Sequence, residues 1–145
     1  MTLIDVVGAL GFGPAWGARG LARAIGHERK LRVAALADPV MRALGRAGHE
    51  AIRAPVAGGR LGLDDGAADA LCVSGLPGEG TPALLGECAR VVKQGGSVLV
   101  ATALGKSRRG PDRHVVAALF LHAGLVDIQQ QLARGVVITS GRVRR

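Results

Sequence analysis

The chain has 145 residues, of which 48% are hydrophobic: enough for one domain with a substantial core and too few for two domains of ordinary size. With one Trp, two Phe and no Tyr, the core must be aliphatic, and aromatic platforms for nucleic-acid bases are scarce. The formal net charge of +8 favours acidic partners, but an Arg-, Ala- and Gly-rich composition can also reflect a GC-rich genome. We expect residues 1–145 to form a single basic domain.

Nothing in the sequence indicates a membrane, secreted or metal-binding protein. No apolar run reaches the length of a membrane span, and the first residues lack the pattern of a signal peptide. Cys72 and Cys88 fall at expected core positions, which favours reduced thiols over a disulfide or a metal site. No His and Cys cluster has the spacing of metal ligands. We expect a cytoplasmic protein without a metal.

The first half of the chain is predicted to alternate strands and helices. Proline after Asp38 can open a helix, and the glycines between residues 8 and 13 mark a turn. The predicted elements are a strand at 3–7, a glycine-rich turn at 8–13, a helix at 14–25, a strand at 31–37, a helix at 40–47, a weak strand at 51–54 and a loop at 55–60.

The strongest structural signals lie in the second half. Residues 69–74 are a nearly continuous apolar run, which is typical of a strand covered on both faces of a parallel sheet. Thr81 is the predicted N-cap of the next helix, and Gly95 and Gly96 are its predicted end. The later elements are a strand at 97–102, a helix at 111–123 that turns Val115, Val116, Leu119 and Phe120 inward and stops at Gly124, and strands at 125–129 and 136–139.

This order of elements predicts an α/β fold: a doubly wound, mostly parallel sheet with helices on both faces and a C-terminal antiparallel β-hairpin. Three features carry a resemblance: the acidic turn at residues 63–66, the Arg90-Val91-Val92-Lys93-Gln94-Gly95-Gly96 segment, and the final hairpin. Together they resemble the Rossmann-like class I S-adenosylmethionine-dependent methyltransferases, most strongly over residues 61–102. In that family the segment usually reads R-V-L-K-P-G-G, so Gln94 replaces a proline. The segment is structural and supports the fold better than an activity.

The resemblance implies a cofactor loop, D-x-G-x-G-x-G, after the first strand. If Asp5 keeps the family position, Val7 and Ala9 replace the first two glycines; an alignment on Gly8 places Leu10 on the second. The motif is therefore degraded in either alignment, and side chains there would crowd the methionine end of S-adenosylmethionine. The residues of this loop that could bind the cofactor are Asp5, Gly8, Gly11 and Gly13.

Two further landmarks of the family can be compared with this chain. Asp38 follows the second strand, where the family has an acid that binds the ribose hydroxyls, although an Asp before Pro is equally an ordinary helix start. The acid that contacts adenine after the third strand has no counterpart in residues 55–59. Ser74, after the fourth strand, is a further cofactor candidate.

Catalytic groups are sparse. Methyl transfer depends mainly on positioning and desolvation, and a base is needed only when the acceptor loses a proton. The two weak candidates are His114, at the start of the last helix, and Glu79, after the strand at 69–74. A solvated histidine at a helix start is the plainer interpretation of His114.

Four residues are candidates for partner binding. Phe12 and Trp16 flank the degraded loop, where they pack on the sheet, stack on adenosine or form a partner surface. Arg108 and Arg109 follow the strand at 97–102 and either contact phosphate or lie on a solvated surface. No nucleic-acid-binding motif accompanies them.

Two functions remain open. The chain is either a divergent methyltransferase whose pocket is completed by another subunit, or a methyltransferase-like domain without catalysis that serves as a protein-binding or assembly module; a basic nucleic-acid-binding module is a weaker third. Because the first strand starts at Thr2 or Leu3, we expect no upstream helices to cover the cofactor. The partner would be another protein or a second copy of the chain.

Overall fold

The computed structural model of the chain describes residues 14–26, 29–57, 59–76, 80–103, 113–133 and 136–144, without the side chains of 14–16, 103 and 133. The predicted strand at 3–7 and the glycine-rich turn at 8–13 lie outside these residues.

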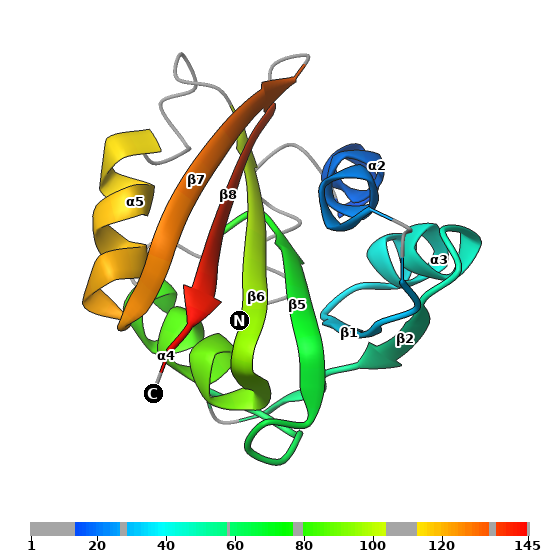
Figure 1. Cartoon of the computed structure of the whole chain (residues 1–145), viewed down its shortest axis with the longest axis horizontal. Helices are drawn as coiled ribbons and strands as arrows, with labels where there is room; N and C mark the ends of the chain where they lie inside the picture. The colour runs from blue at the N-terminus through cyan, green and yellow to red at the C-terminus, as the bar shows by residue number, and fades with distance from the viewer. Residues whose placement is uncertain are drawn as a thin grey trace.

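A six-stranded sheet forms the centre of the molecule, in the order β2-β1-β5-β6-β8-β7 (Figure 1). Its first four strands are parallel, and β8 runs antiparallel between β6 and β7, so the chain ends in the predicted hairpin. The predicted fold class is therefore confirmed. The strands are β1 (Arg32–Ala35), β2 (Glu50–Arg53), β5 (Ala68–Ser74), β6 (Val92–Ala103), β7 (Leu125–Ala133) and β8 (Val136–Val143).

Helices cover both faces of this sheet (Figure 1). Alternate residues of β5 divide between two cores: Ala70 and Cys72 pack toward the first pair of helices, and Leu71 and Val73 toward the second. This explains why residues 69–74 read as a continuous apolar run, since both faces of the strand are buried. The first pair is α2 (Pro14–Ile25) and α3 (Asp38–Arg46), and the second is α4 (Thr81–Val91) and α5 (Arg113–His122).

The pairing of β1 with β5 departs from the usual doubly wound order. In that order, 3-2-1-4-5-6, the first strand lies between the second and the fourth. Here β1, the second predicted strand, is hydrogen-bonded directly to β5, the fourth, with Val33 opposite Ala70 and Ala35 opposite Cys72. No described strand lies between them, and their direct pairing leaves no room for one.

The predicted end of α4 is wrong. The helix ends at Val91, and Val92 already has extended backbone and pairs with Ala68. Gly95 and Gly96 therefore belong to the start of β6. Gly96 is required by crowding, because a Cβ there would lie 2.3 Å from the Asp69 carbonyl oxygen. A glycine pair is typical both of a helix end and of a crowded strand, and only the packing distinguishes the two.

Smaller corrections concern helix ends and one loop. Thr81 is the first residue of α4 and not its N-cap, which is Gly80; the Thr81 side chain is buried. Val115 is 49% exposed on the outer side of α5, whereas Val116 and Phe120 point inward as predicted. The predicted loop at 55–60 contains a short antiparallel pair, β3 (Val56–Ala57) and β4 (Arg60–Leu61).

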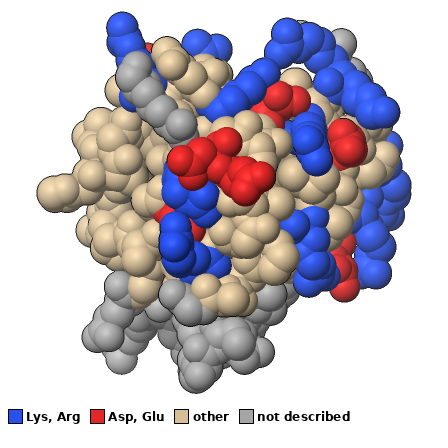
Figure 2. Space-filling model, turned by 90° about the horizontal axis from the view of Figure 1, so that it is seen from below, with Lys and Arg blue, Asp and Glu red and all other residues tan. Residues whose placement is uncertain are grey.

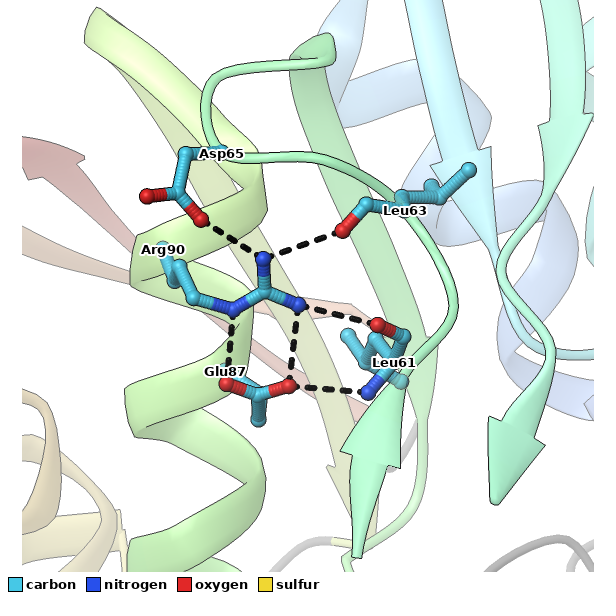
Figure 3. Close-up of polar contacts among 5 residues, drawn as sticks. All are labelled: Leu61, Leu63, Asp65, Glu87 and Arg90. Carbon is cyan, nitrogen blue, oxygen red and sulfur yellow. Dashed lines mark hydrogen bonds and ion pairs between the residues drawn. The ribbon is translucent and has the colours of Figure 1, made fainter.

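Arg90 of α4 holds the segment that enters β5 (Figure 3). Its Nη1 donates to the Asp65 carboxylate at 2.7 Å and to the Leu63 carbonyl at 3.0 Å, and its Nη2 donates to the Leu61 carbonyl at 2.9 Å. Its Nε donates to Glu87, one turn earlier in α4, at 2.8 Å. We call this group of residues, Leu61, Leu63, Asp65, Glu87 and Arg90, the Arg90 clamp.

Glu87 completes the Arg90 clamp from the helix side. Its second carboxylate oxygen accepts the Leu61 N–H at 2.9 Å and an Arg90 Nη2–H at 3.0 Å. The hydrogen bond from Arg90, and after it that from Leu61, holds the pKa of Glu87 below its usual value. The stabilisation is thus complete above the unfolded pKa of about 4.3 and is lost as the pH falls through the lowered folded pKa.

A buried histidine secures the entry to β1. The His49 Nδ1 accepts the Leu31 N–H at 3.1 Å, and its Nε2 lies 2.6 Å from the Gly26 carbonyl oxygen. An imidazole that accepts at Nδ1 and donates at Nε2 is neutral, so these two bonds assign its tautomer. His49 therefore ties the end of α2 to the beginning of β1 and β2.

Replacement of Arg90 tests the clamp. Arg90→Met removes the guanidinium and leaves the partly buried Glu87 carboxylate and two carbonyls without their donor, so we expect a loss of about 2–3 kcal/mol in the free energy of unfolding. Arg90→Lys keeps the charge but loses the fork geometry and should recover less than half of the loss. Urea unfolding measures both, with Arg42→Met on exposed α3 as the matched control. Equal effects at Arg90 and Arg42 would exclude the clamp as a major stabilising feature.

Two glycines of the same region should respond to alanine in opposite directions. Gly96→Ala forces a Cβ against the Asp69 carbonyl and should destabilise the fold by about 2–4 kcal/mol. Gly86→Ala places a methyl group on an exposed helix position with no atom within 4 Å and should stabilise by about 0.5–1 kcal/mol. Thermal unfolding measures both. If Gly96→Ala leaves the stability unchanged, the neighbouring backbone can move away from the added Cβ, and crowding does not require glycine at this position.

Candidate functional site

The carboxyl ends of β1, β2, β5 and β6 lie at the same edge of the sheet, because these four strands are parallel. In Figure 1 this edge is clearest for β5 and β6, whose carboxyl ends are at the top. In open α/β sheets, small molecules bind outside this edge. We call it the carboxyl edge. The described polar side chains on it are Asp38, Arg53, Ser74 and Thr102.

Asp38 is the first residue of α3, immediately beyond the end of β1, and its side chain is 65% exposed. Its Oδ1 pairs with the Arg53 guanidinium at the end of β2. The N-cap of α3 is Ala37, so Asp38 makes no side-chain cap, although its charge suits the first turn of a helix. Its other carboxylate oxygen has no partner among the described residues. Asp38 can therefore accept hydrogen bonds from a ligand that shares it with, or displaces, Arg53.

Ser74 ends β5 beneath α2. Its side chain is buried, and its Oγ has no hydrogen-bond partner in the described part of the chain. The helix approaches so closely that a Cβ on Gly17 would lie 2.7 Å from this oxygen. Gly75 then turns the chain with φ of +85° and donates its N–H to the Ala101 carbonyl at 2.7 Å. The Ser74 hydroxyl is thus held rigidly on the α2 side of the edge.

Thr102 is the corresponding hydroxyl on the other face of the sheet. It lies one residue before the end of β6, 1% exposed, and its Oγ1 also lacks a partner among the residues described. Val98 and Val100 precede it at alternate positions and pack toward α4 and α5, so Thr102 faces that side. The sequence analysis missed Thr102, although a hydroxyl residue at the end of an apolar strand is the signal that singled out Ser74.

Unpartnered buried hydroxyls are unusual. Each costs about 1–3 kcal/mol relative to a satisfied one, and in native proteins such a group commonly has a water or a ligand as its partner. Two of them at neighbouring strand ends distinguish the carboxyl edge from the rest of the described core, where the other buried side-chain polar atoms are bonded. The edge therefore has one exposed carboxylate, at Asp38, and two buried hydroxyls without a described partner, one on each face of the sheet.

The other predicted site residues are not brought together. His114 is exposed in the first turn of α5, on the face of the sheet opposite to α3 and Asp38. No carboxylate occurs at residues 54–57, after β2, as the sequence indicated. Trp16 lies in α2, without a described side chain. The residues that lie outside the described part are Asp5, Gly8, Gly11, Phe12, Gly13, Glu79, Arg108 and Arg109.

The cysteines are core residues, as predicted. Cys72 and Cys88 are free thiols with no exposed surface. Burial raises the pKa of both, that of Cys88 to about 12, so neither forms the thiolate that nucleophilic catalysis or metal binding requires. Across the described ranges, no three His, Cys, Asp or Glu side chains group as metal ligands. Within the same ranges, the helices are too short or too polar to cross a bilayer.

Comparison with known proteins identifies the fold. No protein-family model matches the sequence, and no curated protein does. Three of the solved structures that are similar in fold illustrate the likeness. One is an S-adenosylmethionine-dependent methyltransferase of Thermotoga maritima, with 12% identity, 88% of each chain covered and a TM-score of 0.57. Another is the protein in complex with the Trm112 methyltransferase activator of Haloferax volcanii, with 12% identity, 90% of each chain covered and a TM-score of 0.66.

The third is the 1,6-didemethyltoxoflavin-N1-methyltransferase of Burkholderia thailandensis, whose structure contains S-adenosylhomocysteine. It shares 13% identity, with 88% of this chain and 79% of that chain covered, and a TM-score of 0.59. Identities this low establish a common fold and not a common reaction. The chain has a class I S-adenosylmethionine-dependent methyltransferase-like fold, as the sequence analysis expected.

Proposed function

We propose that the chain is a small, divergent S-adenosylmethionine-dependent methyltransferase whose cofactor binds at the carboxyl edge. The observation that carries this proposal is the exposed Asp38 carboxylate, beyond the end of β1, on the face of the sheet where the buried Ser74 hydroxyl at the end of β5 lacks a partner among the described residues. Asp38 would accept hydrogen bonds from the ribose hydroxyls, and Ser74 would contact the ligand from the end of β5. The loop residues Asp5, Gly8, Gly11 and Gly13 would support the methionine end.

The chemistry required of the protein is modest. S-adenosylmethionine supplies a methyl group bound to a positively charged sulfur, which transfers in an in-line displacement. The chain must hold this group and the acceptor in line and exclude water. His114 or Glu79 would serve as a base only for an acceptor that loses a proton. The methyl acceptor is not identified by any of these groups.

A second subunit completes the pocket in this proposal. The structural neighbour that forms a complex with the Trm112 activator supports a protein partner for this fold. Phe12, Trp16, Arg108 and Arg109 are the proposed contacts, and the partner is another protein or a second copy of the chain. The buried free thiols Cys72 and Cys88 suit the reducing cytoplasm, where we place the protein.

The direct pairing of β1 with β5 favours a second candidate, a non-catalytic assembly module. In the usual order the strand that carries the glycine loop stands between these two, at the point where the ligand binds. The ion pair between Asp38 and Arg53 also occupies the carboxylate that the ribose would need. In this alternative, the domain keeps the scaffold and binds a protein partner without a cofactor.

Calorimetric titration with S-adenosylmethionine and S-adenosylhomocysteine separates the two functions. If the chain is a methyltransferase, we expect dissociation constants in the micromolar range. Asp38→Asn should lower the affinity about tenfold, and Arg53→Gln should raise it, because this change frees the Asp38 carboxylate. Asp64→Asn, in the exposed turn before β5, is the matched control. If neither compound binds to the chain alone or to the chain with its partner, the methyltransferase proposal is wrong and the assembly module is the remaining function.

Removal of the two unpartnered hydroxyls, those of Ser74 and Thr102, tests whether they bind a ligand. Without ligand, Ser74→Ala and Thr102→Val should leave the free energy of unfolding unchanged or raise it by up to about 1 kcal/mol, because no protein hydrogen bond is lost. Thr139→Val, which removes the acceptor of the 3.1 Å bond from Gln130, should lower it by about 1 kcal/mol. Weaker S-adenosylmethionine binding by Ser74→Ala would identify a ligand contact. A destabilised Ser74→Ala or Thr102→Val variant would show that the hydroxyl has a partner within the protein.

A further inference from the structure

A second hollow lies at the other end of the sheet, away from the carboxyl edge. It is a cavity of about 280 Å³ between the end of α2 and the hairpin strands. Its floor is apolar and comes from three neighbouring strands, with Ala70 of β5, Leu99 of β6 and Ile138 of β8. Ala24 and Ile25, at the end of α2, close one side. We call it the amino-end hollow, because it opens toward the amino ends of the parallel strands.

Polar side chains surround this floor on the hairpin side. Ser97 precedes Leu99 by two residues on the same face of β6, and Ser140 lies opposite Leu99 in β8. Gln129 of β7 is paired with Ser140, and Gln131 is paired with Ile138. These hydroxyls and amides stand on the sheet face that carries α2 and α3 farther along. The hollow is therefore lined by hydrogen-bond donors and acceptors.

Three cations from different parts of the chain reach the same hollow. They are Arg29, from the connection after α2, Lys93 at the start of β6 and Arg142 near the end of β8. Arg29 and Arg142 have no carboxylate partner among the described residues. Figure 2, which views the molecule from below, shows several separate groups of Lys and Arg side chains on this face, with Asp and Glu side chains between them. The hollow thus carries more positive than negative charge.

Asp69, the one carboxylate among the described residues of the hollow, is already engaged. It pairs with the Lys93 ammonium at 2.8 Å and accepts the Arg32 N–H at 2.8 Å. The hydrogen bond from Lys93, and after it that from Arg32, lowers the pKa of Asp69, which therefore stays ionised at neutral pH. The charge of Arg29 also lowers the pKa of Asp69, so this single carboxylate offsets part of the charge of Lys93 and Arg29, and the described lining keeps a net positive charge to attract a ligand.

Arg142 also links the hollow to two adjoining depressions at the edge of the sheet. Both contain Asp127, and one reaches Arg144. Asp127 stands at an irregularity in β7, with φ of +53°, a conformation that favours glycine, asparagine and aspartate. The lined surface is accordingly longer than a single ion requires, with cations at Arg29, Arg142 and Arg144 along it.

We propose that the amino-end hollow binds a phosphate-bearing ligand. Cations without carboxylate partners, together with serine hydroxyls and glutamine amides, suit the oxygens of phosphate groups, which accept hydrogen bonds and carry negative charge. The length of the lined surface favours several phosphates in series. These belong to a small polyphosphate compound or to the backbone of single-stranded RNA. None of the described residues that line the hollow is aromatic, so the proposed binding rests on phosphates and not on stacked bases.

This site is independent of the proposed methyltransferase. It lies at the opposite end of the sheet from Asp38 and shares no residue with the carboxyl edge. A failure of S-adenosylmethionine binding therefore leaves it untouched, and the reverse holds as well.

Binding is measured with two probes, a fluorescent oligouridylate by anisotropy and inorganic tripolyphosphate by calorimetry and by competition. For RNA held by three cations, the logarithm of the association constant should fall with the logarithm of the salt concentration with a slope of about −2, at about 0.7 per contact. Tripolyphosphate that binds alone and is not displaced by the oligonucleotide would identify a small phosphate compound as the ligand. No binding of either probe at low salt overturns the proposal.

Matched variants locate the binding. Arg142→Gln should lower the affinity for the probe that binds about fivefold. For RNA, it should also reduce the magnitude of the salt slope by about 0.7, and Arg29→Gln should have the same effects. Asp127→Asn removes a negative charge, retains a residue that tolerates positive φ, and should strengthen binding about twofold. Arg42→Gln, on exposed α3 away from the hollow, makes the same change in net charge. Equal weakening by Arg42→Gln and Arg142→Gln would show diffuse attraction to a basic protein and overturn the site.

Discussion

The fold depends on how the chain enters its central strand, and the Arg90 clamp controls that entry. One guanidinium joins a helix that follows β5 to the turn that precedes it, through two carboxylates and two backbone carbonyls. The clamp therefore ties α4 to β4 and to the turn before β5, and so holds both ends of the segment that contains β5. A lysine ammonium has three donors and no fork geometry, so it could not serve these two carboxylates and two carbonyls together, which explains why the position suits arginine.

The sheet carries two different surfaces at its opposite ends, the carboxyl edge and the amino-end hollow. At the carboxyl edge, β5 and β6 end in hydroxyls that the described core leaves unpartnered, beside an exposed carboxylate. At the other end, the hairpin strands extend past α2 and expose polar side chains with uncompensated cations. Because both ends belong to the same rigid sheet, ligands at the two ends would be held apart by the full length of the strands.

Most of the fold could be predicted because its signals are local. Residues 69–74, the apolar face of α4 and the stop at Gly124 follow from periodicity and glycine chemistry, and each was found in place. Gly95 and Gly96 were misplaced because a glycine pair marks a helix end and a crowded strand equally well. At the site, Asp38 and Ser74 were found from their positions after strands, but Thr102 and the Asp38–Arg53 pair were not.

The sequence by itself determined the order of strands and helices and the aliphatic core, since both depend on residue types at short spacing, and its resemblance to a known family indicated the methyltransferase-like architecture. Only the tertiary structure decided that β1 pairs directly with β5, that Arg53 forms an ion pair with Asp38, and that Arg29, Lys93 and Arg142 line one hollow. These are contacts between segments far apart in the chain. Their existence depends on packing and on competition between partners, which a pattern of residue types along the chain does not encode.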